Sequence, residues 1–344
     1  MGCGIGLSVS PIYVAEITPS RYRGIASNVT NFVTVFAICI SSMFGYFSGW
    51  TVTAGFPIFI ALFIIFGLLF AVESPKYVYY NSSKAKAIQC LSKIRSRRWN
   101  IPSEMLAWEA KDEADSAMSV QKEDDDTQSI IPNTNRSILE LFRNNMYRKH
   151  LLIVCALHAL QQLSGMNVVY YYSTFIFREI FPANANLYSL LLTVFNIFSS
   201  VPLFFIIEKY KRQTLLRITF LGAGISHAIL CFSLIRGVAY LSVISMLSIL
   251  AFFNMGIGLL PFLLIPELFD LPMVGYATFI AVSVNWLFNI AIAGTFLIFL
   301  MVLKEYVFLV FMACTFFGAY IVKFIPETRN LTSEQVVAIA SSVQ

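Results

Sequence analysis

Uncharged amide side chains gather in one otherwise apolar stretch of this chain, at Gln161, Gln162 and Asn167. An amide both donates and accepts hydrogen bonds, which suits a ligand rich in hydroxyl groups. The alternative is that these amides hold neighbouring helices together. On an unbroken helix the three side chains would spread over more than half of the circumference, but Gly165 and the crowded run Tyr170–Tyr172 would permit a local break.

Two more asparagines lie in the middle of long apolar stretches. Asn196 falls within residues 185–207, and Asn289 falls within residues 275–301. A polar side chain at this depth in a membrane is costly unless its hydrogen bonds are satisfied. Each asparagine is therefore a candidate for a functional site.

Charged residues recur where the apolar stretches end on one side. Such residues can latch one helix end to another through ion pairs that form and break as a bundle rocks. The simpler interpretation is that they anchor the helix ends at the membrane surface, but their recurrence at successive ends favours a latch. The candidates for this latch are Glu16, Arg23, Glu73, Glu208, Arg212 and Glu267.

Composition predicts the elements that must position these residues. The chain has 344 residues, is 58% apolar and 12% charged, and has a mean hydropathy of +0.72, whereas soluble proteins average about 45–50% apolar and about 25% charged residues. So few charges cannot build a water-facing shell, which indicates an all-α polytopic membrane bundle. The stretches long enough to span a bilayer are 24–49, 54–72, 150–176, 185–207, 214–235, 240–265, 275–301 and 306–325.

An insert at residues 76–149 interrupts the spans and concentrates the charged residues. We expect a short helical domain there, with a disordered acidic stretch at about 119–135. Lys and Arg gather on the insert's side of the spans, which places that side and the C-terminus in the cytosol. The predicted domains are residues 1–75, 76–149 and 150–325, followed by a tail at 326–344.

Several classes of protein find no support in the sequence. The net charge of +5 is small, and no basic stripe interleaves with aromatic residues, which argues against nucleic-acid binding. The three histidines form no metal-binding pattern, the six cysteines lack zinc or redox spacing, and no nucleophile elbow or phosphate loop occurs. We therefore expect neither an enzyme nor a cofactor or metal site.

One segment of the sequence is similar to a known family. The run QQLSGMNVVYYYS at residues 161–173 resembles the seventh-helix signature of the sugar porters of the major facilitator superfamily, and within them the facilitative glucose transporters of animals. The segments PIYVAEITP with the following RG, then ESPK and PETR, resemble the cytosolic signatures of the same family. The resemblance extends from Met1 to about Val336.

The resemblance implies a passive carrier of hexoses, in the plasma membrane. Glucose is the implied substrate, with fructose as a second, because His158-Ala159-Leu160 replaces the Gln-Leu-Ser of glucose-preferring members. The resemblance implies that the residues that bind the sugar are Gln161, Gln162, Asn167, Asn196, Asn254, Phe262, Trp286 and Asn289.

The segment that aligns with the family's tenth helix departs from the pattern. Asn254 stands where the family has an acidic residue, Phe262 stands where it has a sugar-stacking Trp, and both hinge prolines are missing. Gly256, Gly258 and Pro261 still leave a bendable segment. These differences bear on the affinity for glucose.

Aligned with the family, the chain begins within the fourth helix, so we expect a major facilitator fold that lacks the first three helices. Residues 1–75 would form the end of helix four with helices five and six, and residues 150–325 a complete six-helix half. Because the family's pathway lies between two such halves, transport by this truncated form is in question. The alternative function is a non-transporting form whose partners are full-length transporter chains.

Overall fold

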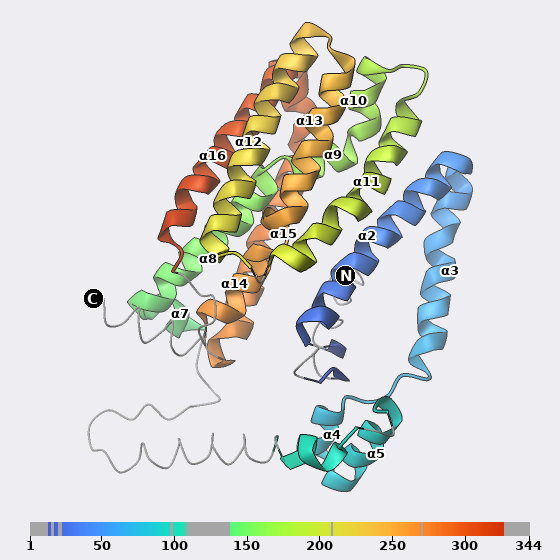
Figure 1. Ribbon diagram of the computed structural model, residues 1–344, viewed down its shortest axis with the longest axis vertical. Coiled ribbons are helices and arrows are strands. Elements are labelled where there is room, and N and C mark those ends of the chain that lie inside the picture. The colour runs from blue at the N-terminus through green and yellow to red at the C-terminus, as the bar shows by residue number, and fades with distance from the viewer. Residues whose placement is uncertain are drawn as a thin grey trace. The chain divides into compact units, whose positions relative to one another are not determined.

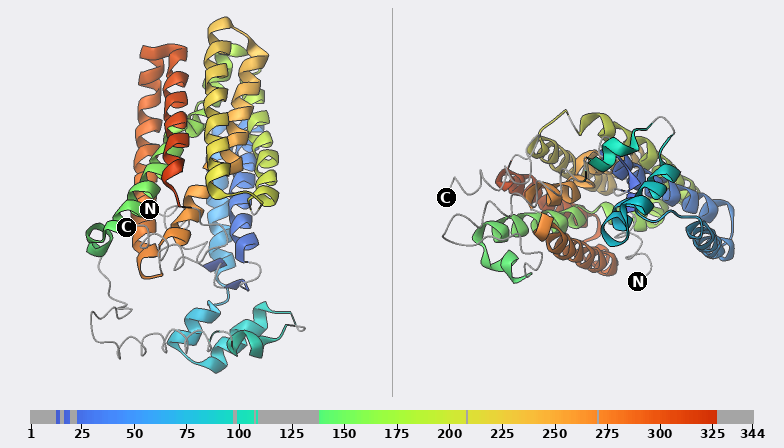
Figure 2. Two further views of the ribbon diagram at one scale, coloured as in Figure 1. Left: turned by 60° about the vertical axis from the view of Figure 1, so that its left-hand side comes forward. Right: turned by 90° about the horizontal axis from the view of Figure 1, so that it is seen from below.

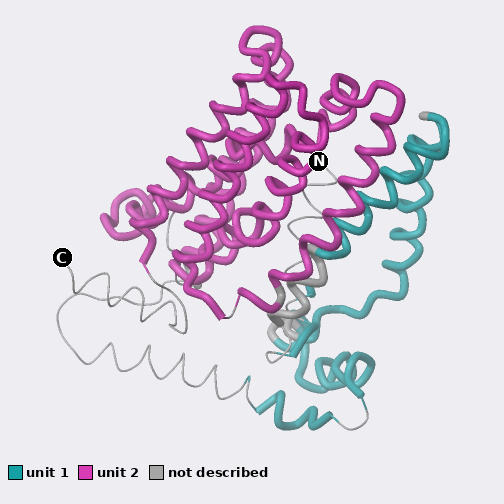
Figure 3. The backbone as a smooth tube through the Cα atoms, turned by 45° about the horizontal axis from the view of Figure 1, so that its top comes forward, with its two compact units in different colours: residues 1–133 teal, residues 134–344 magenta. Residues whose placement is uncertain are grey.

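The computed structural model describes residues 13–14, 17–19, 23–96, 99–106, 108, 138–207, 209–269 and 271–326. The chain divides into two compact units, residues 1–133 and 134–344 (Figure 3), and each is described by itself. The regular elements within the described residues are all helices, which confirms the predicted all-α class. The finer domain boundaries predicted from sequence stay a prediction.

Two long apolar helices make up much of unit 1. Helix α2 spans Arg23–Phe47 and helix α3 spans Trp50–Leu68. They contact each other, and the ring centroids of Phe44 and Phe56 lie 4.3 Å apart. None of the side chains in the α3 segment Thr51–Leu68 is buried within the molecule, as expected for a helix whose apolar surface faces lipid.

Two shorter helices open the polar insert, α4 (Pro75–Asn81) and α5 (Lys84–Ile94). A serine caps the start of each helix, because the hydroxyl oxygens of Ser74 and Ser83 accept hydrogen bonds from backbone N–H groups in the first turn, at 3.3 and 3.4 Å. The expected helical character of the insert is therefore present here. The predicted disordered stretch at 119–135 lies outside the described residues.

An ion pair stabilises the insert where α5 ends. The guanidinium of Arg95 donates to both carboxylate oxygens of Glu104, at 2.9 and 2.7 Å, and Trp99 Nε1 donates to the same carboxylate at 2.8 Å. Arg95 also donates to the backbone carbonyl of Ile17 at 2.7 Å. Such a bidentate and largely buried pair connects the insert to a segment 78 residues earlier in the same unit.

Unit 2 is a bundle of long helices that run side by side (Figures 1 and 2). A short helix, α7 (Leu139–Arg143), precedes the first long one, α8 (Asn145–Leu163). The elements that follow are α9 (Met166–Tyr171), α10 (Ser173–Ile180), α11 (Ala185–Ile206), α12 (Arg212–Arg236), α13 (Ala239–Phe252), the π-helical turn η2 (Phe253–Ile257), α14 (Leu260–Leu268), α15 (Leu271–Leu303), the 3-10 turn η3 (Lys304–Tyr306), α16 (Val307–Ile321) and the 3-10 turn η4 (Val322–Phe324).

Helix α12 packs closely against α13 and α16. Glycine permits this approach, since a Cβ at Gly222 would lie 2.4 Å from the ring of Phe252. The buried side chains form two clusters, one around Leu157 and Leu264 and the other around Met166. In the segment that carries the α8–α9 break, the buried apolar residues up to Leu160 belong to the first cluster and those from Met166 onward belong to the second.

The helices of both units match the predicted spans. Six continuous helical segments in the described part of the chain are long and apolar enough to cross a membrane. The longest, Met273–Phe324, contains two of the predicted spans, α15 and α16, while α2 contributes the shorter apolar segment Phe32–Phe47. The prediction of a polytopic membrane bundle is confirmed.

Candidate functional site

The helix that carries the first amides is broken, as the sequence predicts. Helix α8 ends at Leu163, and Gly165 adopts the left-handed conformation, with φ of 75°, before α9 begins. A second interruption at Tyr172 separates α9 from α10. Glycine is needed at the first break, because a Cβ there would be strained at this φ and would lie 2.8 Å from the ring of Phe311.

Amide side chains from both sides of this break converge in one hydrogen-bonded network. Gln162 lies at its centre: Nε2 donates to Asn285 Oδ1 at 2.7 Å, while Oε1 accepts from Asn289 Nδ2 at 3.2 Å. The same Oε1 also accepts from Asn167 Nδ2. Gln162 and Asn285 are only 8% and 5% exposed. The structure therefore brings together predicted residues from α8, α9 and α15.

Gln161 connects this network to a break in another helix, at the turn η2 between α13 and α14. Its Nε2 donates to the backbone carbonyls of Ile257 and Gly258, at 2.9 and 2.7 Å, and its Oε1 accepts from Asn285 Nδ2 at 2.7 Å. The two carbonyls lie where the π-helical turn η2 interrupts the path from α13 to α14. The bendable segment that the sequence predicts here is confirmed, and such turns free carbonyls from regular helical pairing.

Asn196 and Asn254 form a separate pair. Asn254 Nδ2 donates to Asn196 Oδ1 and to Ser199 Oγ, both at 2.6 Å. This pair joins α11 to η2, and Asn196 is 1% exposed. The structure thus brings these two predicted residues to each other, and within the described residues their hydrogen bonds stay between α11 and η2.

The two predicted aromatic residues remain partly open, with Phe262 39% and Trp286 45% exposed. The ring of Phe262 meets the imidazole of His158 edge-on, with centroids 4.5 Å apart. Trp286 directly follows Asn285 on α15, and successive helical residues point about 100° apart. The indole therefore points in a different direction from the buried amide beside it.

Two residues of the network are missing from the predicted site. Asn285 bridges both glutamines, and its Nδ2 also lies 3.2 Å from His158 Nδ1 and 3.3 Å from the His158 carbonyl. His158 is fully buried. A signal for Asn285 was present in the sequence, because it precedes Asn289 by four residues and so shares its face of the helix.

Of the predicted latch residues, the structure joins Arg212 to Glu267. Arg212 Nη2 lies 3.2 Å from Glu267 Oε1, and the guanidinium also donates to the carbonyl of Ile207. The two charged side chains are 13% and 19% exposed. This partly buried pair connects the start of α12 to the end of α14.

The other latch candidates lie either outside the described residues or at an exposed position. Glu16 and Glu208 lie outside the described residues, and so does the side chain of Arg23. Glu73 is exposed, two residues before α4 begins. Their role in a latch stays a prediction.

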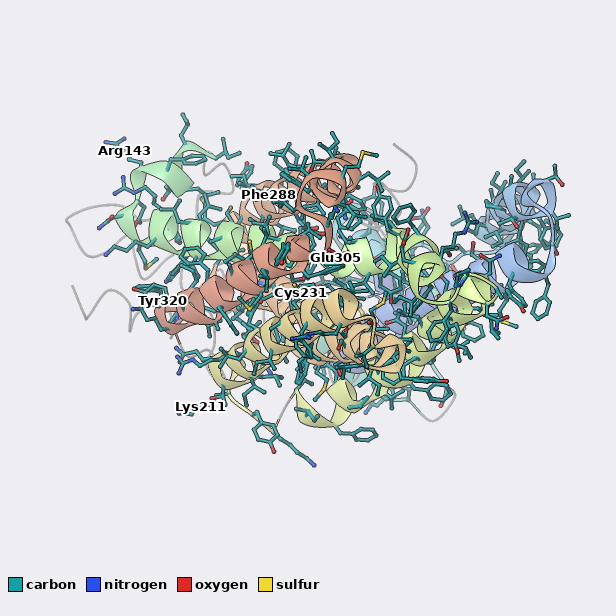
Figure 4. The ribbon with its side chains drawn as sticks, turned by 90° about the horizontal axis from the view of Figure 1, so that it is seen from above. Arg143, Lys211, Cys231, Phe288, Glu305 and Tyr320 are labelled. Atoms are coloured by element: carbon teal, nitrogen blue, oxygen red, sulfur yellow. The ribbon has the colours of Figure 1, made fainter. Side chains whose placement is uncertain are left out.

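A cavity of about 670 Å³ elsewhere in unit 2 contains none of the predicted sugar residues. Its wall is largely apolar, with charged groups from Glu179, Lys304 and Glu305, the last of which is labelled in Figure 4. In the part of the chain that the structure describes, no three His, Cys, Asp or Glu residues are placed to hold a metal ion. The candidate site therefore rests on the amide network.

Comparison with known proteins places the sequence among transporters. The profile of the family described as Sugar (and other) transporter matches residues 1–339. Solute carrier family 2, facilitated glucose transporter member 3 from Homo sapiens is 28% identical over 352 residues, which cover 97% of this chain and 67% of that protein. Member 1 from Gallus gallus is 28% identical over 349 residues, with the same coverage. The chain thus spans about two thirds of the length of these relatives.

Solved structures share the fold. The inward open conformation of the xylose transporter XylE from E. coli gives a TM-score of 0.73 at 24% identity, covering 98% of this chain and 70% of that chain. The major facilitator superfamily proton:xylose symporter XylE bound to 6-bromo-6-deoxy-D-glucose gives 0.74 at 24% identity, covering 98% and 72%. These matches confirm the predicted major facilitator fold, and the relatives are transporters rather than enzymes. Because the family profile covers nearly the whole sequence and the fold agrees with it, this multi-pass membrane protein belongs to the Sugar (and other) transporter family.

Proposed function

We propose that this chain is related in function to the passive hexose carriers of the plasma membrane and binds a hexose at the amide network. The observation that carries the proposal is the convergence of uncharged amides from three helices, at Gln161, Gln162, Asn167 and Asn289. Sugar transport is the activity that describes the family, and relatives named as facilitated glucose transporters support a hexose as the narrower substrate class.

The chemistry of the amides suits hydroxyl groups. In the network the amides form hydrogen bonds with one another, as buried polar groups must. Gln162 Oε1 accepts from both Asn167 and Asn289, so two donors share one acceptor. A sugar hydroxyl can take the place of either bond at little cost, because it both donates and accepts. We expect these two bonds to open when the sugar enters.

The remaining predicted residues extend the proposed pathway. The open faces of Phe262 and Trp286 offer contact to the apolar face of a sugar ring. Asn196 and Asn254 supply further amides from α11 and η2. Phe262 has no indole N–H, and His158 packs against it. Fructose as a second substrate is supported by His158-Ala159-Leu160, which resembles the segment of hexose carriers that also take fructose.

Passive transport is supported by the charge distribution. Within the described spans of unit 2, acidic residues occur near helix ends, as at Glu179 and Glu267, and not at mid-span where a coupling acid would serve. The bias of Lys and Arg supports an orientation with the insert and the C-terminus in the cytosol. The Arg212–Glu267 pair would then act as a latch at the cytosolic ends of α12 and α14.

Equilibrium binding tests the proposal. Radiolabelled D-glucose is titrated onto the full chain in lipid nanodiscs, with unlabelled D-glucose, D-fructose and L-glucose as competitors. We expect saturable binding that both D-sugars displace and L-glucose does not. Asn289→Leu should weaken it, whereas Asn186→Leu, at an exposed position near the start of α11, is the matched control. Absence of displaceable binding would refute hexose binding by this chain.

A second candidate function is supported by α3. Phe59 and Phe63 are 67% and 68% exposed, and no side chain of the segment Thr51–Leu68 is buried. Such a surface is open to lipid or to a second transporter chain, and in the second case the protein would act as a partner of full-length carriers. Saturable hexose uptake by liposomes that contain this chain alone would favour the carrier, while absent uptake with cross-linking from α3 to a co-expressed carrier would favour the partner.

A further inference from the structure

A buried histidine on a helix outside the amide network contacts the break between α8 and α9. His227 lies within α12 and is fully buried. Its Nε2 lies 2.8 Å from the backbone carbonyl oxygen of Ser164. Because a carbonyl only accepts, Nε2 must carry the hydrogen and donate it. Among the described residues, Nδ1 of this ring has no hydrogen-bond partner. The hydrogen bond of the imidazole is therefore the one to the Ser164 carbonyl, at the break.

The Ser164 carbonyl lies where regular helical pairing stops. Helix α8 ends at Leu163, and Gly165 turns the chain through the left-handed conformation. Carbonyls at a helix end lack intrahelical partners, and an unsatisfied carbonyl is costly away from water. His227 supplies a donor to one of them. Its ring also packs on the turn, since a Cβ at Gly165 would lie 3.2 Å from His227 Cε1, and the ring centroid of Phe311 lies 5.7 Å from that of the imidazole.

The orientation of α9 relative to α8 decides whether the amides meet. Gln162 precedes the break and Asn167 follows it, yet their side chains are hydrogen bonded to each other. Ser164 is tied to the same region, because its Oγ donates to the carbonyl of Gln161 at 2.6 Å. A rotation of the backbone at Gly165 would separate Asn167 from the glutamines.

We propose that His227 is a positioning residue that holds the α8–α9 break in the orientation that aligns the amides for a hexose. The inference rests on the hexose binding proposed for the network. His227 acts through the Ser164 carbonyl and not through the sugar. Without its N–H, Gly165 has a wider choice of backbone conformations, and Asn167 leaves Gln162 for part of the time.

Two substitutions separate the hydrogen bond from simple packing. His227→Leu removes the donor and keeps an apolar side chain, whereas His227→Gln places an amide N–H near the position of Nε2. His150→Leu is the matched control, because His150 is also a buried histidine (5% exposed) but packs against Phe269, away from the break. Each full-length variant is measured in nanodiscs for hexose Kd and for the exchange of backbone amide hydrogens.

We expect His227→Leu to raise the hexose Kd about tenfold and to speed amide exchange in α9, which follows the break. His227→Gln should restore most of both values, and His150→Leu should change neither of them. If amide hydrogen exchange in α9 is unchanged in His227→Leu, the proposal is overturned whatever the hexose Kd. It is also overturned if exchange in α9 becomes faster while the hexose Kd stays the same. If the wild-type chain binds no hexose, the proposed function fails, whereas faster α9 exchange that His227→Gln reverses would still support the role of His227 at the break.

Discussion

Replacement of Gln161 by leucine would remove the side chain that joins the amide network to the helix break at η2. Its hydrogen bonds to the carbonyls of Ile257 and Gly258, and the one from Asn285, would be lost. Hydrogen bonds between membrane helices average about 0.6 kcal/mol and reach about 1.7 kcal/mol. Leucine fills a similar volume and adds little cavity cost, so three such bonds predict a loss of about 2 kcal/mol in the free energy of unfolding.

The same change should weaken hexose binding by about 1–3 kcal/mol, because sugar hydroxyls would face leucine instead of an amide. Unfolding of the full chain in mixed micelles measures the first quantity, and radioligand binding in nanodiscs measures the second. Lys93→Ala, exposed on α5 in the polar insert, is the control and should change neither. Equal hexose affinities for the two variants would refute the assignment of Gln161 to the sugar.

Other predictions concern the break, the latch and the orientation. Gly165→Ala should lower the free energy of unfolding by at least about 2 kcal/mol, given its φ and the nearby ring; an unchanged denaturation midpoint would contradict this. Arg212→Met and Glu267→Gln should show a coupling of about 1 kcal/mol in a double-mutant cycle of unfolding free energies, and strictly additive effects would argue against an ion pair. The Asn-x-Ser/Thr sequences at Asn28, Asn81, Asn135 and Asn330 lie on the proposed cytosolic side or at a cytosolic span end, so none of them should be glycosylated. A glycosidase-sensitive mobility shift assigned to Asn135 would overturn the proposed orientation.

The spans are predictable because crossing a bilayer demands about 20 apolar residues in a row. The span predicted at 185–207 is observed as α11, Ala185–Ile206. The break at Gly165 is also predictable, because a glycine before three crowded tyrosines weakens a helix locally. Both features depend on residues adjacent in sequence, which is why sequence alone suffices for them.

The position of Asn285 as the bridge between the two glutamines is harder to predict. It depends on which face of α15 meets α8, a choice made by packing between segments more than 120 residues apart. The separate pairing of Asn196 with Asn254 has the same origin, since it needs η2 to approach α11. The sequence shows that these asparagines lie in membrane spans, where an unsatisfied polar side chain is costly. Their hydrogen-bond partners can be identified only in the folded bundle. That these residues bind a sugar stays a prediction.

The contacts of Gln161 also determine the direction of any hydrogen bond that it can offer to a ligand. An amide group has two N–H donors and an oxygen with two lone pairs. Both donors of Gln161 are directed at the carbonyls of Ile257 and Gly258, and one lone pair is directed at Asn285. What remains is an acceptor, so a sugar hydroxyl at this position must give its hydrogen. A fluorine in place of that hydroxyl cannot donate and would find no partner. If the sugar binds here as proposed, the bent backbone of one helix would determine which sugar analogues the side chain of another accepts.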